Sequence, residues 1–477
     1  MGAKVAIIGG GVAGASIALY LGELGLDVTL FEKGKSLVNG PPICHLHAGG
    51  NLYREISDEQ CVTLLHQSID LLRFLPFAVD YRPTVIAVPT DDEGEPQDLC
   101  HRLHLLQSEY KKLVEKDAVN KVLGEVSEYF QTFSQEEVAA LKERETLQNP
   151  QSLEEWMIPV AKNIDLDKVK YPLVMVQEYG LNIFRIAASL SLGLEQIKNV
   201  HVLTQTQVTN VTKNAQNCFD IRYKRSDKEQ SESFDFLINA AGFKSGEIDD
   251  MLGVKRERLV EFKAAYVTKW EGCDTLWPEV IFHGKRGTPQ GMAQFTPYPD
   301  GYFQLHGMTN AITLFDDGLV KSSQQSSQPQ LDARFLHKID KSWKFSDVQE
   351  RSQRAIEHVA RFIPRFEQGK VAAKPLYGAQ QIPGDDATLR AAEVSFEGEN
   401  YARCEIVKAS SVLSMAERIT AQLVNLGMFE EPANKMRTFE ALQKLTEEKI
   451  SAYAEQLCKE RDYPVSLAHR NIKKEVH

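Results

Sequence analysis

Short apolar runs and helical periodicity alternate in the first part of the chain. A continuous apolar run over Val5–Ile8 predicts a buried strand, and Val12 to about Leu24 predicts the helix that follows it. A second strand is expected at Val28–Glu32. Apolar residues on one helical face then predict a helix over Asp58–Phe74, and Thr84–Val88 has the composition of a short strand. This order of elements indicates an α/β fold.

The pattern changes character twice in the middle of the chain. Residues 100–145 are charged and helically periodic, which predicts an inserted helical subdomain with a solvated face. From Tyr179 the α/β pattern returns, with a helix to about Leu194. Apolar and alternating runs then predict three strands, at 200–204, 218–224 and 234–239.

The second half of the chain predicts a different architecture. Residues 261–315 alternate as antiparallel strands do, and Pro299-Asp300-Gly301 marks a hairpin turn. The Ser- and Gln-rich segment 322–330 predicts a surface loop. Helical periodicity then predicts the last three helices, at 346–362, 412–426 and 433–459.

Glycines follow the first predicted strand in the order Gly9, Gly11 and Gly14, and Glu32 ends the second strand. The first glycine permits a tight turn, the second lets backbone approach a pyrophosphate, and the third lets the helix pack closely. Val12 and Ala13 open that helix, whose free N–H groups suit phosphate. The carboxylate of Glu32 can accept hydrogen bonds from ribose hydroxyls. The motif therefore predicts FAD or NAD binding.

Composition narrows the class of protein. The 477 residues suffice for two or three domains, and the formal charge of −11 argues against a nucleic-acid partner. The seven cysteines show no metal-ligand spacing, so we expect no metal site and reduced thiols in a cytoplasmic protein. No apolar run is long enough to span a membrane, and the N-terminal stretch lacks a cleavage site for a signal peptide. Peripheral contact with the inner membrane stays open as an alternative.

Several segments together resemble the D-amino-acid oxidase-like (DAO) superfamily of FAD-dependent oxidoreductases, which has a glutathione-reductase-type FAD-binding fold. The N-terminal glycine motif is one of these segments, and Gly180-Leu181-Asn182-Ile183-Phe184-Arg185 is another. A third is 202–211, similar to a family strand pair whose valine contacts adenine, here Val208. A fourth is Asn239-Ala240-Ala241-Gly242, similar to the family turn beside the flavin pyrophosphate. The stretch 47–53 faintly resembles malate:quinone and 2-hydroxyglutarate dehydrogenases.

The resemblance implies an α/β fold with a Rossmann-like FAD-binding domain interleaved with an antiparallel-sheet substrate domain. The FAD-binding domain would comprise residues 1–80, 171–255 and 371–428. The substrate domain would comprise a helical insertion, 81–170, and residues 256–370, followed by a C-terminal helical extension, 429–477. The N-terminal motif then holds FAD rather than NAD, and Lys33 beside Glu32 joins the expected FAD contacts. The family also places residues near the flavin ring in the loop after Glu32, which makes His45 a candidate to line the pocket or, less readily, to attach FAD covalently.

One segment departs from the family pattern. The family closes with a Gly-rich turn over the flavin, whereas the equivalent place here is Lys408-Ala409-Ser410-Ser411 before a helix. Its backbone N–H groups and the Lys408 ammonium could stabilise charge on the reduced flavin. Alternatively, Lys408 is solvated and Ser410 only caps the helix.

No second glycine motif for NAD(P)H is present, so the predicted reductant is an organic substrate. We expect hydride transfer from a carbon that bears an amine or a hydroxyl to flavin N5, with oxygen or a quinone as the final acceptor. Arg390, and secondly Arg403, could bind a substrate carboxylate, or each could form a structural salt bridge. His306 could accept the hydroxyl proton, or be a histidine hydrogen-bonded within its sheet.

Two further functions compete with this hypothesis. One is a flavin-dependent monooxygenase or halogenase reduced by a separate partner, and the other is a non-catalytic flavoprotein. The C-terminal helix is expected to pack on the body of the protein, with dimerisation or membrane docking as alternatives. Substrate identity, electron acceptor and oligomeric state are left open by the sequence.

Overall fold

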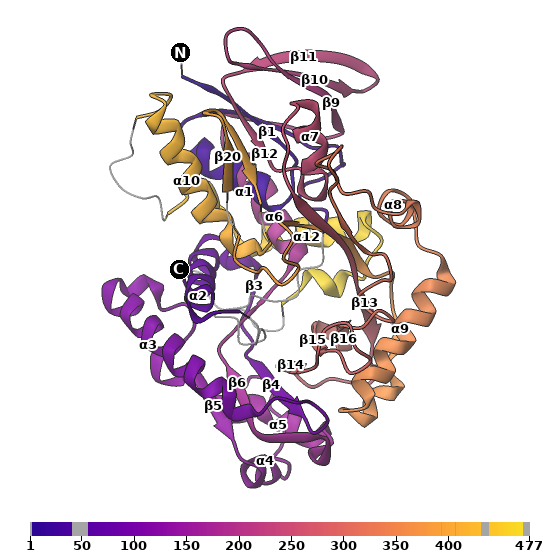
Figure 1. Cartoon of the computed structure of the whole chain (residues 1–477). Helices are drawn as coiled ribbons and strands as arrows, with labels where there is room; N and C mark the ends of the chain where they lie inside the picture. Colours follow the sequence, from indigo (N-terminus) through magenta and orange to yellow (C-terminus); the bar gives the residue numbers. More distant parts are fainter. Residues whose placement is uncertain (1, 41–55, 393, 406, 431–437, 471–477) are drawn as a thin grey trace.

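The computed structural model describes residues 2–40, 56–392, 394–405, 407–430 and 438–470. Its two large sheets stand one above the other in Figure 1, with the N-terminal sheet and its helices above and the larger mixed sheet below. The first strand and helix form as predicted, as β1 (Lys4–Ile8) and α1 (Val12–Glu23). The fold class is therefore α/β, as the sequence indicates.

The N-terminal sheet has six strands in the order β20-β21-β12-β1-β2-β8. Five of them run parallel, and only β20 (Val394–Glu397) runs antiparallel to its neighbour. The other members are β2 (Asp27–Phe31), β8 (Val200–Leu203), β12 (Phe236–Asn239) and β21 (Tyr401–Cys404). The helices α6 (Ile183–Leu194) and α10 (Val412–Asn425) pack against α1. A separate three-stranded sheet comprises β9 (Thr206–Lys213), β10 (Phe219–Arg225) and β11 (Lys228–Phe234).

The second sheet has ten strands and is built around β13 (Arg258–Lys269). Its path runs β17-β13-β16-β15-β14-β4-β6-β5, and β18 and β19 also pair with β13. These strands are β4 (Thr84–Pro89), β5 (Phe130–Phe133), β6 (Val169–Val176), β14 (Glu279–Phe282), β15 (Ala293–Pro297), β16 (Tyr302–Gly307), β17 (Leu319–Lys321), β18 (Lys370–Val371) and β19 (Leu376–Pro383). The hairpin between β15 and β16 turns at Pro299–Gly301 as predicted.

The two faces of the ten-stranded sheet have different neighbours. Tyr266, Phe295 and Leu305 point into a core shared with α5 (Leu153–Asn163) and α9 (Phe345–Ala360). Because side chains alternate along a strand, the residues between them point to the opposite face. On that face Val267 and Ile281 join the core of the N-terminal domain. The sheet therefore has one face toward its own helices and one toward the N-terminal domain.

The region expected to be a helical insertion is only partly helical. The helix α2 (Asp58–Phe74) precedes it as predicted, and the region itself contains α3 (Cys100–Lys116) and α4 (Gln135–Leu141). Between α3 and α4 lies β5, which pairs with β6 at the end of the large sheet. The Phe and Thr residues of this short strand gave too little periodicity to distinguish it from its helical surroundings.

Two other segments differ from the sequence-based expectation. The Ser- and Gln-rich loop 322–330 is not wholly at the surface, because Ser327 and Gln328 are buried against α7 (Ser245–Met251). The prediction of one continuous C-terminal helix over 433–459 is wrong as well. The chain forms α11 (Glu440–Gln443) and α12 (Glu447–Glu460), separated where Thr446 caps the second helix with its side chain.

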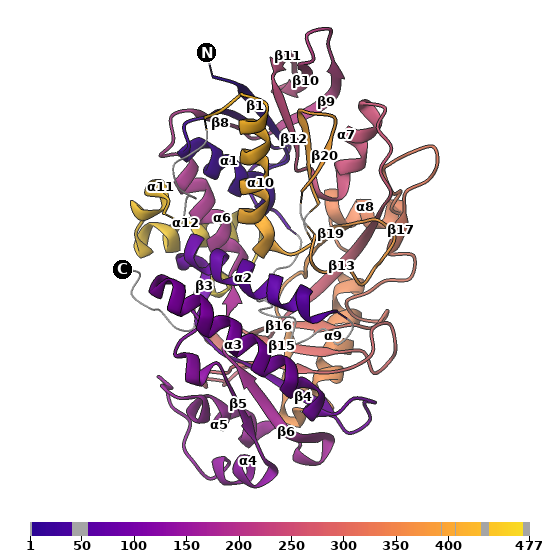
Figure 2. The same ribbon diagram turned by 60° about the vertical axis from the view of Figure 1, so that its left-hand side comes forward.

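The C-terminal helices are fastened to α6. Figure 2 shows α11 and α12 beside α6, and Leu442 and Ile450 enter the N-terminal core. Arg185 of α6 is fully buried and donates two 2.7 Å hydrogen bonds to the Glu447 carboxylate. Asn182, which caps α6, also donates to the carbonyl of Leu467. The expected packing of the C-terminal segment on the body of the protein is confirmed.

We expect the change Arg185→Met to loosen this attachment. It removes charge-assisted hydrogen bonds to a partly buried carboxylate, and the free energy of unfolding should fall by about 1.5–3 kcal/mol. Denaturant titration measures the loss, and limited proteolysis should show faster cleavage after residue 430. Lys444→Gln is the matched control, because the Lys444–Glu440 pair is largely exposed and its removal should cost under ~0.5 kcal/mol. Equal effects of the two changes would contradict the anchoring role of Arg185.

Candidate functional site: a dinucleotide cradle and a partly buried cation cluster

The parallel strands of the N-terminal sheet deliver five loops to one edge. These loops follow the carboxyl ends of β1, β2, β8, β12 and β21, which all point the same way. Ligands of open α/β sheets bind at this edge. All the sequence segments that resemble FAD-binding motifs, apart from the one that opens α6, therefore meet in one place.

The glycine turn after β1 has no room for side chains at two of its positions. A Cβ on Gly14 would lie 1.9 Å from the carbonyl oxygen of Gly9. Gly9 itself has a φ of +106°, and a Cβ there would lie 2.3 Å from the carbonyl oxygen of Ala240. A Cβ on Gly11 would meet nothing within 4 Å, so backbone is open to a ligand there. These are the three roles that the motif assigns to its glycines.

The first turn of α1 is free to receive an anion. Gly11 is its N-cap, no side chain of the described residues caps it, and no acid lies in the first turn, which begins with Val12 and Ala13. The unpaired N–H groups and the positive end of the helix dipole thus point into the edge of the sheet.

Glu32 lies at the end of β2, within the same edge. Its carboxylate accepts hydrogen bonds from the backbone N–H groups of Gly10 at 2.7 Å and Gly34 at 2.5 Å. Its carbonyl accepts from Thr206 at the start of β9, so Val208 lies two residues farther along that strand. Lys33 points elsewhere: its ammonium is half exposed and lies 3.5 Å from Asp340 of α8 (Ala333–Asp340).

The turn after β12 adjoins the glycine turn. The buried Asn239 side chain donates to the carbonyl of Ser245 at 2.9 Å and to the Tyr401 hydroxyl at 2.7 Å, and accepts from the N–H of Ala241. Ala240 touches the glycine turn from the other side, and Gly242 has a φ of +60° with open space where a Cβ would be. The hydrogen bonds of Asn239 thus fix the turn, and the backbone at Gly242 stays open to a ligand.

The loop after β21 leads into α10. The carbonyl of Lys408 accepts hydrogen bonds from both the N–H and the hydroxyl of Ser411. Ser411, and not Ser410, occupies the N-cap of α10, and its side chain makes no cap hydrogen bond there. The alternative in which Ser410 is only the N-cap of the helix is therefore wrong. The roles of Lys408, Ala409, Ser410 and Ser411 toward a flavin remain predictions.

The residues at this edge fit the dinucleotide part of FAD. Two glycine positions exclude any side chain, a third leaves backbone open, a helix N-terminus is uncapped, and an acid stands where a ribose would lie. No group of three or more His, Cys, Asp or Glu residues suited to a metal ion occurs among the described residues. The candidate His45 lies outside the described residues.

A cluster of charged side chains lies on the face of β13 that points toward the N-terminal domain. Glu261, only 5% exposed, forms ion pairs with Lys263, at 2.8 Å, and with Arg286 from the loop after β14. Burial opposes ionisation of Glu261, but the pull of Lys263, Arg286 and Arg390 outweighs it and holds the pKa of Glu261 below its ordinary value. Burial, helped by repulsion from Arg286 and Arg390, lowers the pKa of Lys263. Two cations therefore pair with one carboxylate, and the charge of Arg390 acts on the same group.

Gln380 joins the cation cluster to the nucleotide-binding edge. It lies opposite Glu261 in the β13–β19 ladder, and its side-chain oxygen accepts from the Lys263 ammonium at 3.2 Å. Its side-chain nitrogen donates to the carbonyl of Val407 at 2.6 Å, in the loop after β21. One amide side chain thus spans the distance between the cluster and the edge of the sheet.

Other polar side chains lie farther along the same face. His306 and Gln304 of β16 alternate with Leu305, which points into the opposite core, and Gln294 of β15 lies directly across from His306. His306 is 9% exposed, and its Nδ1 makes no hydrogen bond within the part of the chain described. The alternative was a histidine hydrogen-bonded within its sheet. The Nδ1 atom of His306 does not make such a hydrogen bond.

The structure separates the two candidate arginines. Arg390 donates to the carbonyls of Ala387 and Leu389 in its own loop, and its charge acts on both Glu261 and Lys263. Arg403 is 2% exposed and donates to Asp249 at 2.6 Å and to Glu397 at 3.1 Å. The contacts of Arg403 match the structural salt bridge, whereas the charge of Arg390 acts on the cluster and its role toward a substrate remains a prediction.

Sequence reasoning missed Glu261, Lys263 and Arg286. Two charges spaced two residues apart in an alternating strand are typical of a solvated face. The signal that could have pointed to them is the polar, turn-rich segment 378–390, which contains Gln380 and Arg390. These charges are shielded from water only because the N-terminal domain covers that face of the sheet.

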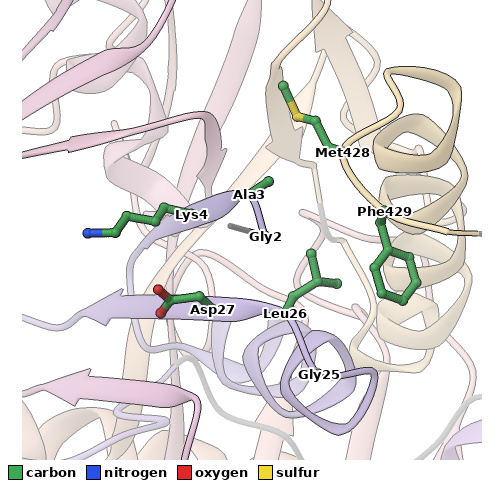
Figure 3. Close-up of a pocket in the computed structure, with 8 residues that line it drawn as sticks. All are labelled: Gly2, Ala3, Lys4, Gly25, Leu26, Asp27, Met428 and Phe429. Carbon is green, nitrogen blue, oxygen red and sulfur yellow. The ribbon is translucent and has the colours of Figure 1, made fainter.

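A hollow of about 280 Å³ lies at the opposite edge of the N-terminal sheet, at the amino ends of β1 and β2. Figure 3 shows Lys4 and Asp27 on one side of it and Phe429 on the other. None of the glycine-turn residues lines it, so this hollow is separate from the nucleotide cradle. No described helix combines the length and apolar character needed to cross a membrane.

Comparison with known proteins agrees with the geometry. The sequence profile of the DAO family, described as FAD dependent oxidoreductase, matches residues 4–387. No curated protein sequence matches the chain. Solved structures share the fold at low identity. The L-α-glycerophosphate oxidase of Mycoplasma pneumoniae with FAD bound is 16% identical, with a TM-score of 0.58 over 92% of this chain and 97% of that one.

Two further solved structures are similar to the same extent. The L-amino acid deaminase of Proteus vulgaris is 14% identical, with a TM-score of 0.57 over 93% of this chain and 97% of that one. The glycine oxidase of Geobacillus kaustophilus is 13% identical, with a TM-score of 0.53 over 90% of this chain and 96% of that one. At these identities the likeness establishes the fold.

Proposed function

Because the chain belongs to the DAO family of FAD-dependent oxidoreductases, we propose that it oxidises a small carboxylate-bearing amine or 2-hydroxy acid. The observation that carries this proposal is the partly buried pair of cations, Lys263 and Arg286, on which the charge of Arg390 also acts and which Gln380 joins to the FAD-binding edge. Guanidinium and ammonium groups that are partly shielded from water favour an anionic ligand. Oxygen or a quinone is the proposed electron acceptor.

The role that we propose for each group follows from its position. The glycine turn, the first turn of α1 and Glu32 would hold the pyrophosphate and ribose of FAD, which supplies a hydride acceptor at flavin N5. The cation cluster would hold the substrate carboxylate and thereby fix which C–H bond is presented. Orientation of this kind lowers the barrier because the bound groups lose no further translational freedom on reaction.

His306 is the proposed proton acceptor for a hydroxyl substrate. It lies on the same sheet face as Lys263, and its Nδ1 is buried without a partner among the described residues. A base in this place would take the hydroxyl proton as the hydride leaves carbon.

Anaerobic mixing with a panel of amino acids and 2-hydroxy acids of both configurations tests the proposal. Bleaching of the flavin absorbance by at least one class is the expected result. If every compound leaves the flavin oxidised while NADPH or a separate reduced flavin supports turnover, the proposal fails. Oxygen consumption during turnover separates an oxidase from a quinone-linked dehydrogenase.

We expect His306→Asn to slow flavin reduction by a 2-hydroxy acid by about 10²–10⁴-fold with little change in KM. The reason is that asparagine keeps a polar group of similar size but cannot accept a proton at neutral pH. Stopped-flow reduction with saturating substrate measures the rate. His337→Asn, at an exposed position of α8, is the control and should leave the rate unchanged. A rate for His306→Asn within threefold of the parent enzyme would remove His306 from this role.

A further inference from the structure

The loop that follows β2, residues 32–38, holds the glycine turn at Gly10. The Glu32 carboxylate accepts from the Gly10 N–H at 2.7 Å, and the Val38 N–H donates to the Gly10 carbonyl at 2.9 Å. A Cβ on Gly10 would lie 2.7 Å from a methyl carbon of Leu37. Both backbone groups of Gly10 are therefore engaged by this loop, and the position of the turn depends on the position of the loop.

Local preference does not explain the conformation of this loop. Val38 is fully buried and has a φ of +54°, in the left-handed region that a β-branched residue rarely adopts. A residue keeps such a conformation only where its surroundings enforce it. Contacts from another part of the chain are therefore needed to hold Val38 in place.

Those contacts come from Arg461, which directly follows α12. Its guanidinium donates to three successive residues of the loop, the Ser36 hydroxyl at 3.0 Å, the Leu37 carbonyl at 2.7 Å and the Val38 carbonyl at 2.9 Å. The planar fork of guanidinium donors can span several acceptors at once, whereas an ammonium is a point charge. One side chain from the end of the chain therefore fixes the loop that holds the glycine turn.

The position of Arg461 is set by its packing on α6. Its guanidinium lies 5.8 Å from the centre of the Phe184 ring, in the first turn of α6. Tyr463 packs against the same ring, with 5.6 Å between the ring centres, and donates to the carbonyl of Pro375 at 2.7 Å. Both Arg461 and Tyr463 lie outside residues 4–387, the segment that matches the DAO profile. The C-terminal segment is thus connected to the nucleotide cradle through the loop after β2.

We infer that Arg461 is a positioning residue for FAD, through which the C-terminal helices hold the loop after β2 against the glycine turn. Binding of FAD and docking of α12 are then coupled, and each strengthens the other by the same factor. The inference goes beyond the proposed function, because it concerns retention of the cofactor and is independent of which substrate is oxidised.

Titration of the apoprotein with FAD, alongside denaturant unfolding of the apoprotein, tests the inference. Arg461→Met keeps an unbranched side chain against Phe184 but removes the three hydrogen bonds. The Kd for FAD should rise about 10- to 100-fold, which corresponds to the loss of one strong hydrogen bond from a charged donor. Arg461→Lys should give a smaller rise, because an ammonium cannot span the same acceptors. Lys459→Gln removes an exposed charge from the last turn of α12 and should leave the Kd within twofold of the parent value.

Hydrogen exchange supplies a readout that a purely structural role would not change. Saturating FAD should slow exchange of the α12 amides in the parent protein more than exchange of the α9 amides, and this difference should vanish in Arg461→Met. A Kd for FAD within threefold of the parent value in Arg461→Met overturns the inference, however far the stability falls. If that variant does not fold, equal slowing of α12 and α9 by FAD in the parent protein overturns it instead. Neither outcome bears on the substrate, so the proposed function would stand.

Discussion

Replacing Gly14 with alanine is expected to yield a protein that does not retain FAD. The added Cβ would lie 1.9 Å from the carbonyl oxygen of Gly9 and 3.2 Å from the Cβ of Ala240. Both neighbours belong to turns that are fixed by hydrogen bonds, since Gly9 donates to Phe31 and Ala240 donates to Ile8. The helix must therefore move away from the strand, and overpacking of this kind costs about 1–3 kcal/mol.

The displacement moves the first turn of α1 away from the pyrophosphate position. The affinity for FAD should therefore fall by about 10- to 100-fold. The ratio of flavin to protein absorbance after purification, and titration of the apoprotein with FAD, measure this loss. Gly2→Ala is the control, because nothing lies within 4 Å of its Cβ at the opposite edge of the same sheet. Full flavin content in the Gly14→Ala protein would contradict the assignment of this turn.

Gly11→Ala separates binding from folding within the same turn. A Cβ at this position meets nothing in the protein, so the fold and its stability should be unaffected. FAD binding should nevertheless weaken, because the methyl group would stand where backbone approaches the pyrophosphate. A variant that is both stable and FAD-loaded would show that the ligand does not approach Gly11.

Removing the carboxylate of Asp249 is expected to destabilise the protein by about 3–5 kcal/mol. Asp249 is fully buried and pairs with two arginines, Arg258 and Arg403, which are 1% and 2% exposed. It also accepts from the Tyr401 hydroxyl at 2.8 Å. In Asp249→Ala both guanidinium groups would stay buried without their counter-charge, and the loss is large for that reason.

Equilibrium denaturation of the FAD-free and FAD-bound protein measures this change. Glu397→Gln is the matched control, since Glu397 pairs with the same Arg403 but is 51% exposed, and its loss should cost under ~1 kcal/mol. The experiment also bears on Arg403. If Arg403→Met lowers stability but leaves substrate KM unchanged, Arg403 holds the domain together and does not bind substrate.

The nucleotide cradle could be predicted from the sequence because its physics is local. A tight turn after β1 requires Gly9, close packing of α1 requires Gly14, and an uncapped helix start requires the absence of acids beside Val12. Each of these requirements involves residues a few positions apart. The helices over 58–74 and 412–425 were likewise predicted within a residue or two, because a long apolar stripe determines them.

The cation cluster could not be predicted in the same way. Lys263 and Arg286 come from different elements, and nothing local says that the strand face bearing Glu261 is covered by another domain. The competing arginine candidates illustrate the same limit. Arg390 and Arg403 both occur in polar surroundings along the chain, and only the fold pairs Arg403 with Asp249 and lets the charge of Arg390 act on Glu261.

The sequence by itself therefore determined the α/β class, the family and the cofactor, because the glycine turn, the uncapped helix and Glu32 impose their conformations within short stretches of chain. The tertiary structure alone decided which charges gather on the covered face of β13. Charges on a strand are solvated or buried according to what packs over them, and for β13 the covering surface comes from segments more than 100 residues away.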